Sequence, residues 1–216
     1  MSPEHEKRLA AEAAAELVAD GMTVGLGTGS SVGAFLPALA ARGLDLRCVA
    51  TSPATEQAAR ELGLHVESFS GPEALPRLDI AIDGADQVAP SGWLVKGGGA
   101  AHTREKAVAA AADRFVVIVS SNKLVERLAP PVPLELLEYG LAGTLRRLGT
   151  VALRDAPRSP DGGVIADYTG EFDDPEELAA RLSATAGVVE HGLFPPALVS
   201  DVIVGNGGLV EIRKLH

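Results

Sequence analysis

The sequence contains a single cysteine, Cys48, so no disulfide can form within the chain, and it lacks the CxxC or Cys/His spacing that holds a structural zinc ion. It also lacks an apolar run of about 20 residues, the length that a membrane-spanning helix requires. The first 20 residues are charged and rich in alanine, without the apolar stretch of a secretory signal peptide. We therefore expect a cytoplasmic protein, in a reducing compartment, with no membrane partner.

Basic residues are also in deficit. The chain has 19 lysines and arginines against 29 aspartates and glutamates, which gives a formal net charge of -10 at pH 7. Such a charge repels nucleic acids and anionic lipids at long range, so we expect no nucleic-acid partner. If the ligand is itself an anion, the site must supply amides and lysines that lie close to it.

The 216 residues, of which 46% are hydrophobic, are enough for one large domain or for a medium and a small one. In the first part of the chain, short apolar segments typical of strands alternate with segments of helical periodicity. The predicted strands are residues 22–26, 46–50, 65–69, 78–82 and 115–119, and the predicted helices are residues 4–20, 34–42, 54–62 and 103–112. This alternation predicts an α/β fold with a doubly wound, mainly parallel, Rossmann-like sheet that has helices on both faces.

Prolines at positions 130, 131 and 133 interrupt this alternation and indicate a connection. Beyond them, we expect strands at residues 131–134, 151–153, 164–168 and 188–192 and helices at residues 134–148 and 174–184, an order typical of ferredoxin-like α+β domains. A last apolar strand, residues 199–205, is expected to return to the first sheet. The predicted domains are therefore a Rossmann-like catalytic domain of residues 1–129 plus 199–216 and a smaller ferredoxin-like domain of residues 130–198.

A glycine-rich loop, G-L-G-T-G-S-S-V-G, lies between a predicted strand and a predicted helix at Gly25–Gly33. Its amides and hydroxyls would lie at a helix N-terminus, where an anion binds readily, although a tight turn is the alternative. The dinucleotide motif G-x-G-x-x-G does not fit, because its last glycine falls on Ser30 or Val32, and no acidic residue follows the next strand. The loop also lacks the Gly-Lys-Ser/Thr ending of a P-loop. It therefore favours a small phosphate ester over a nucleotide.

The motif D-G-A-D-Q, Asp83–Gln87, directly follows an apolar strand. Two acids at the carboxyl end of a parallel strand lie where doubly wound sheets bind ligands, but Asp-Gly is also a common turn sequence. The five histidines are scattered along the chain, so a metal site is disfavoured.

The segment K-G-G-G-A-A-H-T-R-E-K, Lys96–Lys106, contains three consecutive glycines before a predicted helix. Such glycines suit a main chain that approaches a ligand closely or presents amides to an oxyanion, and a flexible linker is the alternative. Glu105 in the first helical turn is favourable for the helix dipole alone. Together with the two preceding motifs, however, a carboxylate, a lysine and glycine amides are the groups that abstract a proton next to a carbonyl.

At this point the chain resembles the ribose-5-phosphate isomerase A family along nearly its whole length. The motifs that carry the resemblance are G-T-G-S-S at Gly27–Ser31, D-G-A-D at Asp83–Asp86, K-G-G-G-A at Lys96–Ala100, T-R-E-K at Thr103–Lys106, S-N-K at Ser121–Lys123 and G-L-F at Gly192–Phe194. Lys7 matches a substrate-binding lysine on the family's first helix. Two positions depart from the pattern: Gln87 replaces a glutamate, and Ser31 replaces a threonine.

The resemblance implies the interconversion of ribose 5-phosphate and ribulose 5-phosphate through a cis-enediolate, a step of the non-oxidative pentose phosphate pathway, with no metal and no cofactor. It implies that Glu105 is the base, that Lys96 stabilises the enediolate, and that Asp83 and Asp86 bind sugar hydroxyls and assist ring opening. The other implied substrate-binding residues are Lys7, Thr28, Gly29, Ser30, Ser31, Gly84, Ala85, Gly97, Gly98, Gly99 and Lys123. The family also implies a homodimer or a homotetramer.

Two other functions are weaker alternatives. A sugar-phosphate sensor with an effector domain of this kind would need a DNA-reading module, but only one helix precedes the first strand and the net charge is -10. A nucleotide-dependent oxidoreductase is disfavoured by the mismatches in the glycine loop. Cys48 lies within a predicted strand without an adjacent histidine, so we expect a buried core residue and not a nucleophile.

Overall fold

The computed structural model describes residues 2–215, which group into two compact units. The first unit comprises residues 2–85, 104–124 and 197–215, and the second comprises Asp86–Thr103 and Val125–Pro196. No helix within residues 2–215 combines the length and the apolar character that crossing a membrane requires.

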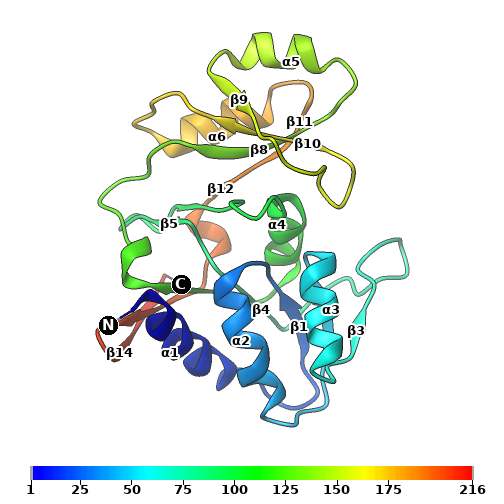
Figure 1. The fold of residues 1–216 in the computed structure, drawn as a ribbon, viewed down its shortest axis with the longest axis vertical. Coiled ribbons are helices and arrows are strands. Elements are labelled where there is room, and N and C mark those ends of the chain that lie inside the picture. The colour runs from blue at the N-terminus through cyan, green and yellow to red at the C-terminus, as the bar shows by residue number, and fades with distance from the viewer. Residues whose placement is uncertain (1, 216) are drawn as a thin grey trace. The chain divides into compact units, whose positions relative to one another are not determined.

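The first unit is built on a seven-stranded sheet with the strand order β14-β13-β7-β4-β1-β2-β3 (Figure 1). Its strands are β1 (Thr23–Leu26), β2 (Arg47–Ala50), β3 (Val66–Glu67), β4 (Ile80–Asp83), β7 (Phe115–Ser120), β13 (Asp201–Asn206) and β14 (Leu209–Lys214). Neighbouring strands are parallel except β13 and β14, which form an antiparallel hairpin. The chain runs from β1 outward to β3 and then returns to β4 on the other side of β1. Ligands of doubly wound sheets bind at such a switch point, beyond the carboxyl ends of the strands.

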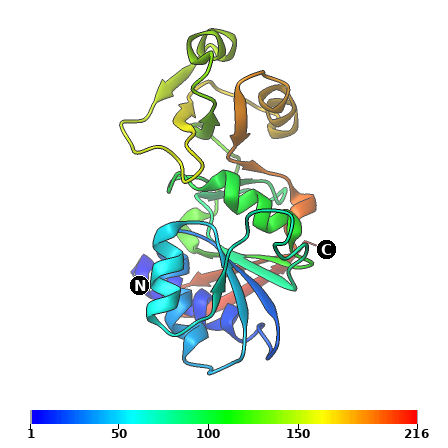
Figure 2. The ribbon, with the colours of Figure 1, turned by 90° about the vertical axis from the view of Figure 1, so that its right-hand side faces the viewer.

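Helices cover both faces of this sheet. On one face, α1 (Pro3–Ala15), α2 (Ser30–Ala40) and α3 (Pro53–Glu61) share a hydrophobic core with strand residues such as Val24 and Leu26. Gly25 points to the opposite face, where a Cβ atom would lie 2.4 Å from Val108 Cγ1 of α4 (His102–Ala111). Both views of the ribbon show α2 and α3 side by side (Figures 1 and 2).

The second unit contains a four-stranded antiparallel sheet with the order β11-β8-β10-β9. Its elements are β8 (Val132–Leu136), α5 (Leu141–Leu148), β9 (Val151–Leu153), β10 (Val164–Tyr168), α6 (Pro175–Ser183) and β11 (Val188–His191). Leu134 and Leu136 of β8 form a core with Leu148 of α5 and Leu182 of α6, so both helices pack on one face of the sheet (Figure 2). A three-stranded sheet, β12-β6-β5, adds β5 (Gln87–Val88), β6 (Leu94–Val95) and β12 (Leu193–Phe194).

The predicted fold class is confirmed: a large, mainly parallel sheet and a smaller antiparallel sheet with the element order β-α-β-β-α-β. The predicted domain division differs from the compact units chiefly at residues 86–103, which the sequence analysis assigned to the first domain and which group with the second unit. The reason is that β5 and β6 pair with β12 and not with the seven-stranded sheet.

Two predicted elements need correction, and one strand was not predicted. The helix expected over residues 134–148 begins at Leu141, because β8 extends to Leu136 and pairs with strands on both sides. The first helix ends at Ala15, short of residue 20, where the Arg42 guanidinium donates to the carbonyl oxygen of Ala15. The strand β14 was not predicted, because only Val210 and Ile212 alternate with polar residues there, and the apolar side chains of Leu209, Val210 and Ile212 are exposed.

Candidate active site

The predicted phosphate-binding residues Thr28–Ser31 lie in the loop after β1 and in the first turn of α2. Gly29 has a φ of 107°, a region that glycine adopts without steric cost, and it directly precedes Ser30, the first helical residue. Gly29 and Ser30 are exposed, while Thr28 and Ser31 are half-buried. Amides in the first turn of a helix have no partner within the helix and attract anions. These four residues therefore lie together beyond the end of a central strand.

Asp83 ends β4, the neighbour of β1, and is only 2% exposed. Its Oδ1 accepts hydrogen bonds from the amides of Thr28 at 3.1 Å and Gly84 at 2.7 Å. Gly27 leaves space for this carboxylate, since a Cβ atom there would lie 2.0 Å from Asp83 Cγ. Asp83 thus ties the loop after β4 to the loop after β1.

Other contacts support the same loops. A Cβ atom on Gly84 would lie 3.4 Å from the Ser31 side chain, so these two predicted residues are neighbours. The Thr28 hydroxyl lies 2.7 Å from the Thr51 hydroxyl, and Thr55 Oγ1 donates to the carbonyl oxygen of Gly27 at 2.9 Å. Sequence reasoning missed Thr51 and Thr55, which come 23 and 28 residues after their partners. Ala85 is half-buried and ends this stretch of the first unit.

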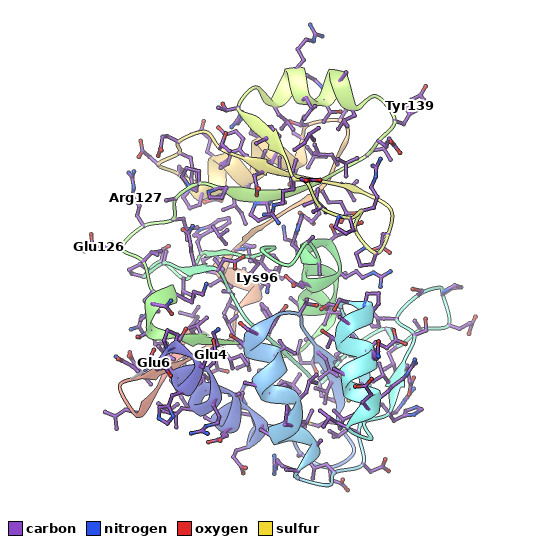
Figure 3. All side chains as sticks on the ribbon, viewed as in Figure 1. Glu4, Glu6, Lys96, Glu126, Arg127 and Tyr139 are labelled. Carbon is purple, nitrogen blue, oxygen red and sulfur yellow. The ribbon has the colours of Figure 1, made fainter. Side chains whose placement is uncertain are left out.

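Lys7 and Lys123 lie on neighbouring elements that a buried glutamate connects. Glu6 on α1 is 7% exposed and accepts hydrogen bonds from the amide and hydroxyl of Ser121, at 3.0 and 2.8 Å, and from the Gly207 amide at 3.1 Å (Figure 3). Ser121 opens the short 3-10 helix Ser121–Lys123. The Gly207 amide, followed by the Ser121 hydroxyl, lowers the pKa of Glu6 below its usual value. Glu6 therefore joins the helix that carries Lys7 to the turn that carries Lys123.

The Lys7 ammonium forms an ion pair with Glu4 at 2.6 Å. The Lys7 side chain is 14% exposed, whereas that of Glu4 is 75% exposed. A solvent-exposed partner is easily exchanged, so this pair leaves Lys7 available to another anion.

Glu105 lies in the first turn of α4 and is 4% exposed. The contact between Val108 and Gly25 places α4 along β1, so Glu105 belongs to the same unit as Asp83 and the Thr28–Ser31 loop. A glutamate is rarely this well buried unless it has a specific partner or a function.

Lys96 follows β6 in the second unit and is 2% exposed (Figure 3). Its amide donates to the carbonyl oxygen of Gly192 at 2.8 Å, and its Nζ lies 5.4 Å from the centre of the Phe194 ring. An ammonium at this distance is attracted by the ring face. The G-L-F motif, singled out only by resemblance, therefore holds Lys96 at both its backbone and its side chain.

Asp86 holds the glycine loop that follows Lys96. Its amide donates to the carbonyl oxygen of Val95, and its Oδ2 accepts a hydrogen bond from the Gly98 amide, both at 2.8 Å. A Cβ atom on Gly98 would lie 2.9 Å from Asp86 Oδ1. Gly97 has a φ of 103°, and a Cβ atom there would lie 2.7 Å from His102 Nδ1. Gly98 and Gly99 are exposed, and the close approach of a ligand to their amides stays a prediction.

Gln87, one of the two departures from the family pattern, uses both ends of its amide. Nε2 donates to the carbonyl oxygen of Ala129 at 2.8 Å, and Oε1 accepts from the Ala129 amide at 2.9 Å. A carboxylate could only accept, so glutamine suits this position.

Cys48 is completely buried in β2, as predicted for a core residue. Burial raises the pKa of its thiol to about 12, so the nucleophilic thiolate does not form near neutral pH. Within residues 2–215, no three His, Cys, Asp or Glu side chains are grouped as a metal site would require.

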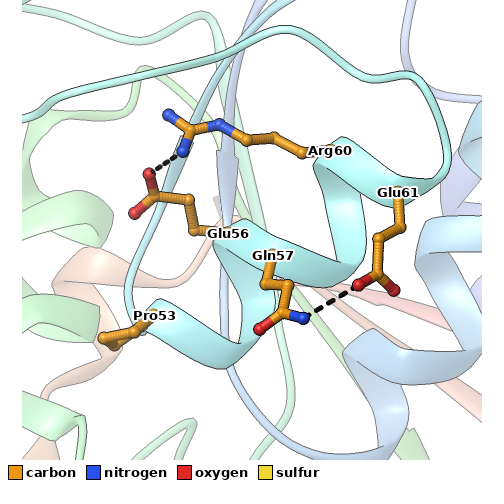
Figure 4. Close-up of a pocket in the computed structure, with 5 residues that line it drawn as sticks. All are labelled: Pro53, Glu56, Gln57, Arg60 and Glu61. Atoms are coloured by element: carbon orange, nitrogen blue, oxygen red, sulfur yellow. Dashed lines mark hydrogen bonds and ion pairs between the residues drawn. The ribbon is translucent and has the colours of Figure 1, made fainter.

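A surface groove lies on α3, lined by Pro53, Glu56, Gln57, Arg60 and Glu61 (Figure 4). Its polar side chains bind one another, Arg60 to Glu56 at 2.6 Å and Gln57 to Glu61 at 2.9 Å. None of the predicted site residues lines this groove.

Known proteins resemble this chain over nearly its full length. Residues 47–208 match the family model of ribose 5-phosphate isomerase A, or phosphoriboisomerase A. The chain belongs to the ribose-5-phosphate isomerase A family. The ribose-5-phosphate isomerase A of Caulobacter vibrioides (strain NA1000 / CB15N) is 44% identical, over 99% of this chain and 100% of that protein. The resemblance inferred from the sequence motifs is thereby confirmed.

Solved structures of the family have the same fold. The ribose 5-phosphate isomerase A from Neisseria gonorrhoeae superimposes with a TM-score of 0.93 at 31% identity, covering 100% of this chain and 98% of that one. A D-ribose-5-phosphate isomerase in complex with phospho-erythronic acid gives a TM-score of 0.91 at 33% identity, covering 99% of this chain and 100% of that one.

Proposed function

We propose that this chain, as a member of its family, is an enzyme that interconverts D-ribose 5-phosphate and D-ribulose 5-phosphate through a cis-enediolate. The base removes the proton from C2, the electron pair forms the C1–C2 double bond, and the negative charge develops on O1. Return of the proton to C1, with transfer of the O2 proton to O1, gives the ketose. The complex of a family structure with phospho-erythronic acid supports this route, because a planar carboxylate presents two oxygens much as a cis-enediolate does.

Glu105 is the base in this proposal. The observation that carries it is the burial of this carboxylate, 4% exposed, in the unit that also holds the Thr28–Ser31 loop. A base shielded from water keeps the abstracted proton and can return it to the neighbouring carbon.

Lys96 and the amides of Gly97–Gly99 stabilise the enediolate oxygens. An ammonium with 2% exposure interacts strongly with a charge that develops beside it, because little water screens it. Since that charge appears only along the reaction, the interaction accelerates the chemical step.

Asp83 and Asp86 bind sugar hydroxyls and assist ring opening, with Gly84 and Ala85 forming the turn between them. Each aspartate uses a carboxylate oxygen to hold backbone amides, at 2.7 to 3.1 Å. A carboxylate has about four lone-pair sites, so it can accept from a backbone amide and from a substrate hydroxyl at the same time.

The phosphate binds to Thr28–Ser31, Lys7 and Lys123. Support comes from the exposed Gly29 and Ser30 at the start of α2 and from Glu6, which connects the elements that carry the two lysines. These groups supply the local positive potential that a dianion needs on a protein of net charge -10.

The direct test replaces Glu105 by Gln, which keeps the shape of the side chain but removes the base. We expect Glu105→Gln to fold like the parent and to lose about 10²- to 10⁴-fold in kcat, the usual contribution of a positioned base. The matched control is Glu126→Gln, an exposed site (Figure 3), which should keep full activity. Turnover by Glu105→Gln close to that of the parent would exclude Glu105 as the base.

The enzyme is proposed to be cytoplasmic and to form a homodimer or a homotetramer. The exposed apolar residues Leu209, Val210 and Ile212 on the edge strand β14 support association, because apolar edge strands invite pairing with another chain. Light scattering of the purified protein would give the number of subunits, and a monomeric mass at micromolar concentration would contradict this part of the proposal.

A further inference from the structure

Arg154, directly after β9 in the second unit, binds a carboxylate and a loop backbone at once. Its Nε and Nη2 donate to the two oxygens of Asp167 on β10, at 2.7 and 2.6 Å. Its Nη1 donates to the carbonyl oxygens of Gly97 at 3.0 Å and Gly98 at 3.3 Å. The side chains of Arg154 and Asp167 are only 21% and 19% exposed. A largely buried ion pair therefore ends on the backbone of the Gly97–Gly99 loop.

These contacts fix the directions in which the loop amides point. In a planar trans peptide, the C=O and N–H groups point in opposite directions. Arg154 holds the carbonyl of Gly97, and the amide on the other side of that peptide, Gly98 N–H, donates to Asp86 at 2.8 Å. Arg154 also holds the carbonyl of Gly98, and by the same geometry it directs the Gly99 N–H away from the guanidinium.

The Gly97–Gly99 loop needs contacts that fix its backbone conformation. Glycine populates more backbone conformations than any other residue, and three glycines follow one another here. A cationic donor on the carbonyl oxygens also polarises the peptide groups, which strengthens their N–H groups as donors to a negative charge. The guanidinium can bind Asp167 with one edge and the loop with the other because its donors form a planar fork, and a lysine ammonium has no such fork.

We propose that Arg154, held in place by Asp167, is a positioning residue for the isomerase reaction: it orients the Gly99 amide toward the enediolate oxygens. The inference rests on the proposed function, in which the Gly97–Gly99 amides stabilise the enediolate. It adds two residues, Arg154 and Asp167, that lie more than 50 positions beyond the loop in the sequence.

The test compares Arg154→Lys and Arg154→Ala with the same changes at Arg127. Arg127 also pairs with an aspartate, Asp173, at 2.7 Å, but both side chains are well exposed, at 64% and 93%. Three quantities are measured for each variant: kcat, KM for ribose 5-phosphate, and Kd for phospho-erythronic acid. Thermal unfolding reports whether each variant is folded.

We expect Arg154→Lys to lower kcat by about 10- to 100-fold, somewhat less than the loss of a whole oxyanion donor, while KM changes by less than about 3-fold. Binding of phospho-erythronic acid should weaken in the same variant, because its carboxylate meets the same amides. Guanidinium ion should restore part of the turnover of Arg154→Ala. The Arg127 variants should behave like the parent in all three measurements.

A kcat of Arg154→Lys within about 2-fold of the parent would overturn the inference, and so would a rise in KM alone. If Arg154→Ala does not fold, the kinetics of Arg154→Lys alone test the inference.

The Glu105→Gln variant distinguishes failure of this inference from failure of the proposed function. If Glu105→Gln loses turnover but Arg154→Lys keeps it, only the role of Arg154 is wrong. If Glu105→Gln keeps turnover, the proposed function of the site fails.

Discussion

Lys96 is a deeply buried charged side chain. It is 2% exposed and lies beside the Phe194 ring. Burying an ammonium costs free energy in the folded protein. In the proposed function, the ammonium offsets this cost by stabilising a charge that forms only during enolisation.

A substitution at Lys96 should therefore affect turnover more than substrate affinity. We expect Lys96→Met, which keeps the length of the side chain, to lower kcat by about 10²- to 10³-fold, the loss typical of an oxyanion donor. Steady-state kinetics with ribose 5-phosphate measures kcat and KM separately, and the exposed Lys214→Met serves as the control. An increase in KM with unchanged kcat would reassign Lys96 to binding of the phosphate.

A substitution at Lys7 should affect substrate affinity more than turnover. We expect Lys7→Ala to raise KM about 10-fold or more, because a charge-assisted contact with the phosphate is worth roughly 1.5–3 kcal/mol. Thermal stability should change little, since the Glu4 partner is exposed. The neighbouring Arg8→Ala, which removes an exposed pair with Glu12, is the control. If Lys7→Ala lowered stability and left KM unchanged, Lys7 would be a structural residue and Lys123 the better candidate for the phosphate.

At the residue scale, the sequence indicates candidate site residues where they lie close together along the chain. The Gly25–Gly33, Asp83–Gln87 and Lys96–Lys106 segments each combine their own glycines, acids or lysines, so the pattern of the chain alone indicates them. Glu6 and Arg154 gave no such signal. Glu6 meets partners 115 and 201 positions away, and Arg154 meets Gly97 57 positions away, so only the folded chain shows these contacts.

At the scale of elements, Glu6 joins α1 to the Ser121–Lys123 turn and to the β13–β14 hairpin. The close approach of α1 to β13 requires Gly205, because a Cβ atom there would lie 2.0 Å from the Glu6 carbonyl oxygen. The hydrogen bonds from Gly207 and Ser121 lower the pKa of Glu6. A carboxyl with a lowered pKa stabilises the fold above its ordinary pKa of 4.5 and loses this contribution as the pH falls through the lower value of the folded protein.

The expected effect of Glu6→Gln is therefore dependent on pH. At pH 7, the variant should unfold at a temperature a few degrees below that of the parent. The glutamine amide is neutral and has only one oxygen, so it cannot replace both carboxylate oxygens as acceptors of the three hydrogen bonds. The difference should shrink as the pH falls below 4.5, because the carboxyl is protonated first in the unfolded chain and then, at a lower pH, in the folded protein. Thermal unfolding across pH 3 to 8 measures this. A gap in unfolding temperature that is the same at every pH would mean that the charge of Glu6 does not contribute.

The element pattern also shows where sequence periodicity was insufficient. β8 and the helix after it were predicted to overlap, because the apolar residues of 134–148 fit a helix as well as a strand. The overlap is resolved by pairing, since β8 lies between β10 and β11. The short strands β5, β6 and β12 have two residues each, which is too few for an alternation of apolar and polar residues to be recognised in the sequence.

For the whole molecule, our central claim is that an acidic protein binds a sugar phosphate through local amides and lysines and isomerises it with its own side chains. The fold class and the family follow from the sequence because strands, helices and motifs keep their order along the chain. The composition of the two compact units did not follow as closely, because residues 86–103 join the second unit through strand pairing with β12.

The measurement that tests this claim most directly is the formation of ribulose 5-phosphate from ribose 5-phosphate by the purified protein, before and after dialysis against a chelator. We expect equal rates in both samples, and a much lower rate with free ribose, which lacks the phosphate. Loss of activity after dialysis, with recovery when a divalent metal is restored, would contradict the proposed metal-free proton transfer. No ketose from ribose 5-phosphate in either sample would contradict the proposed reaction itself.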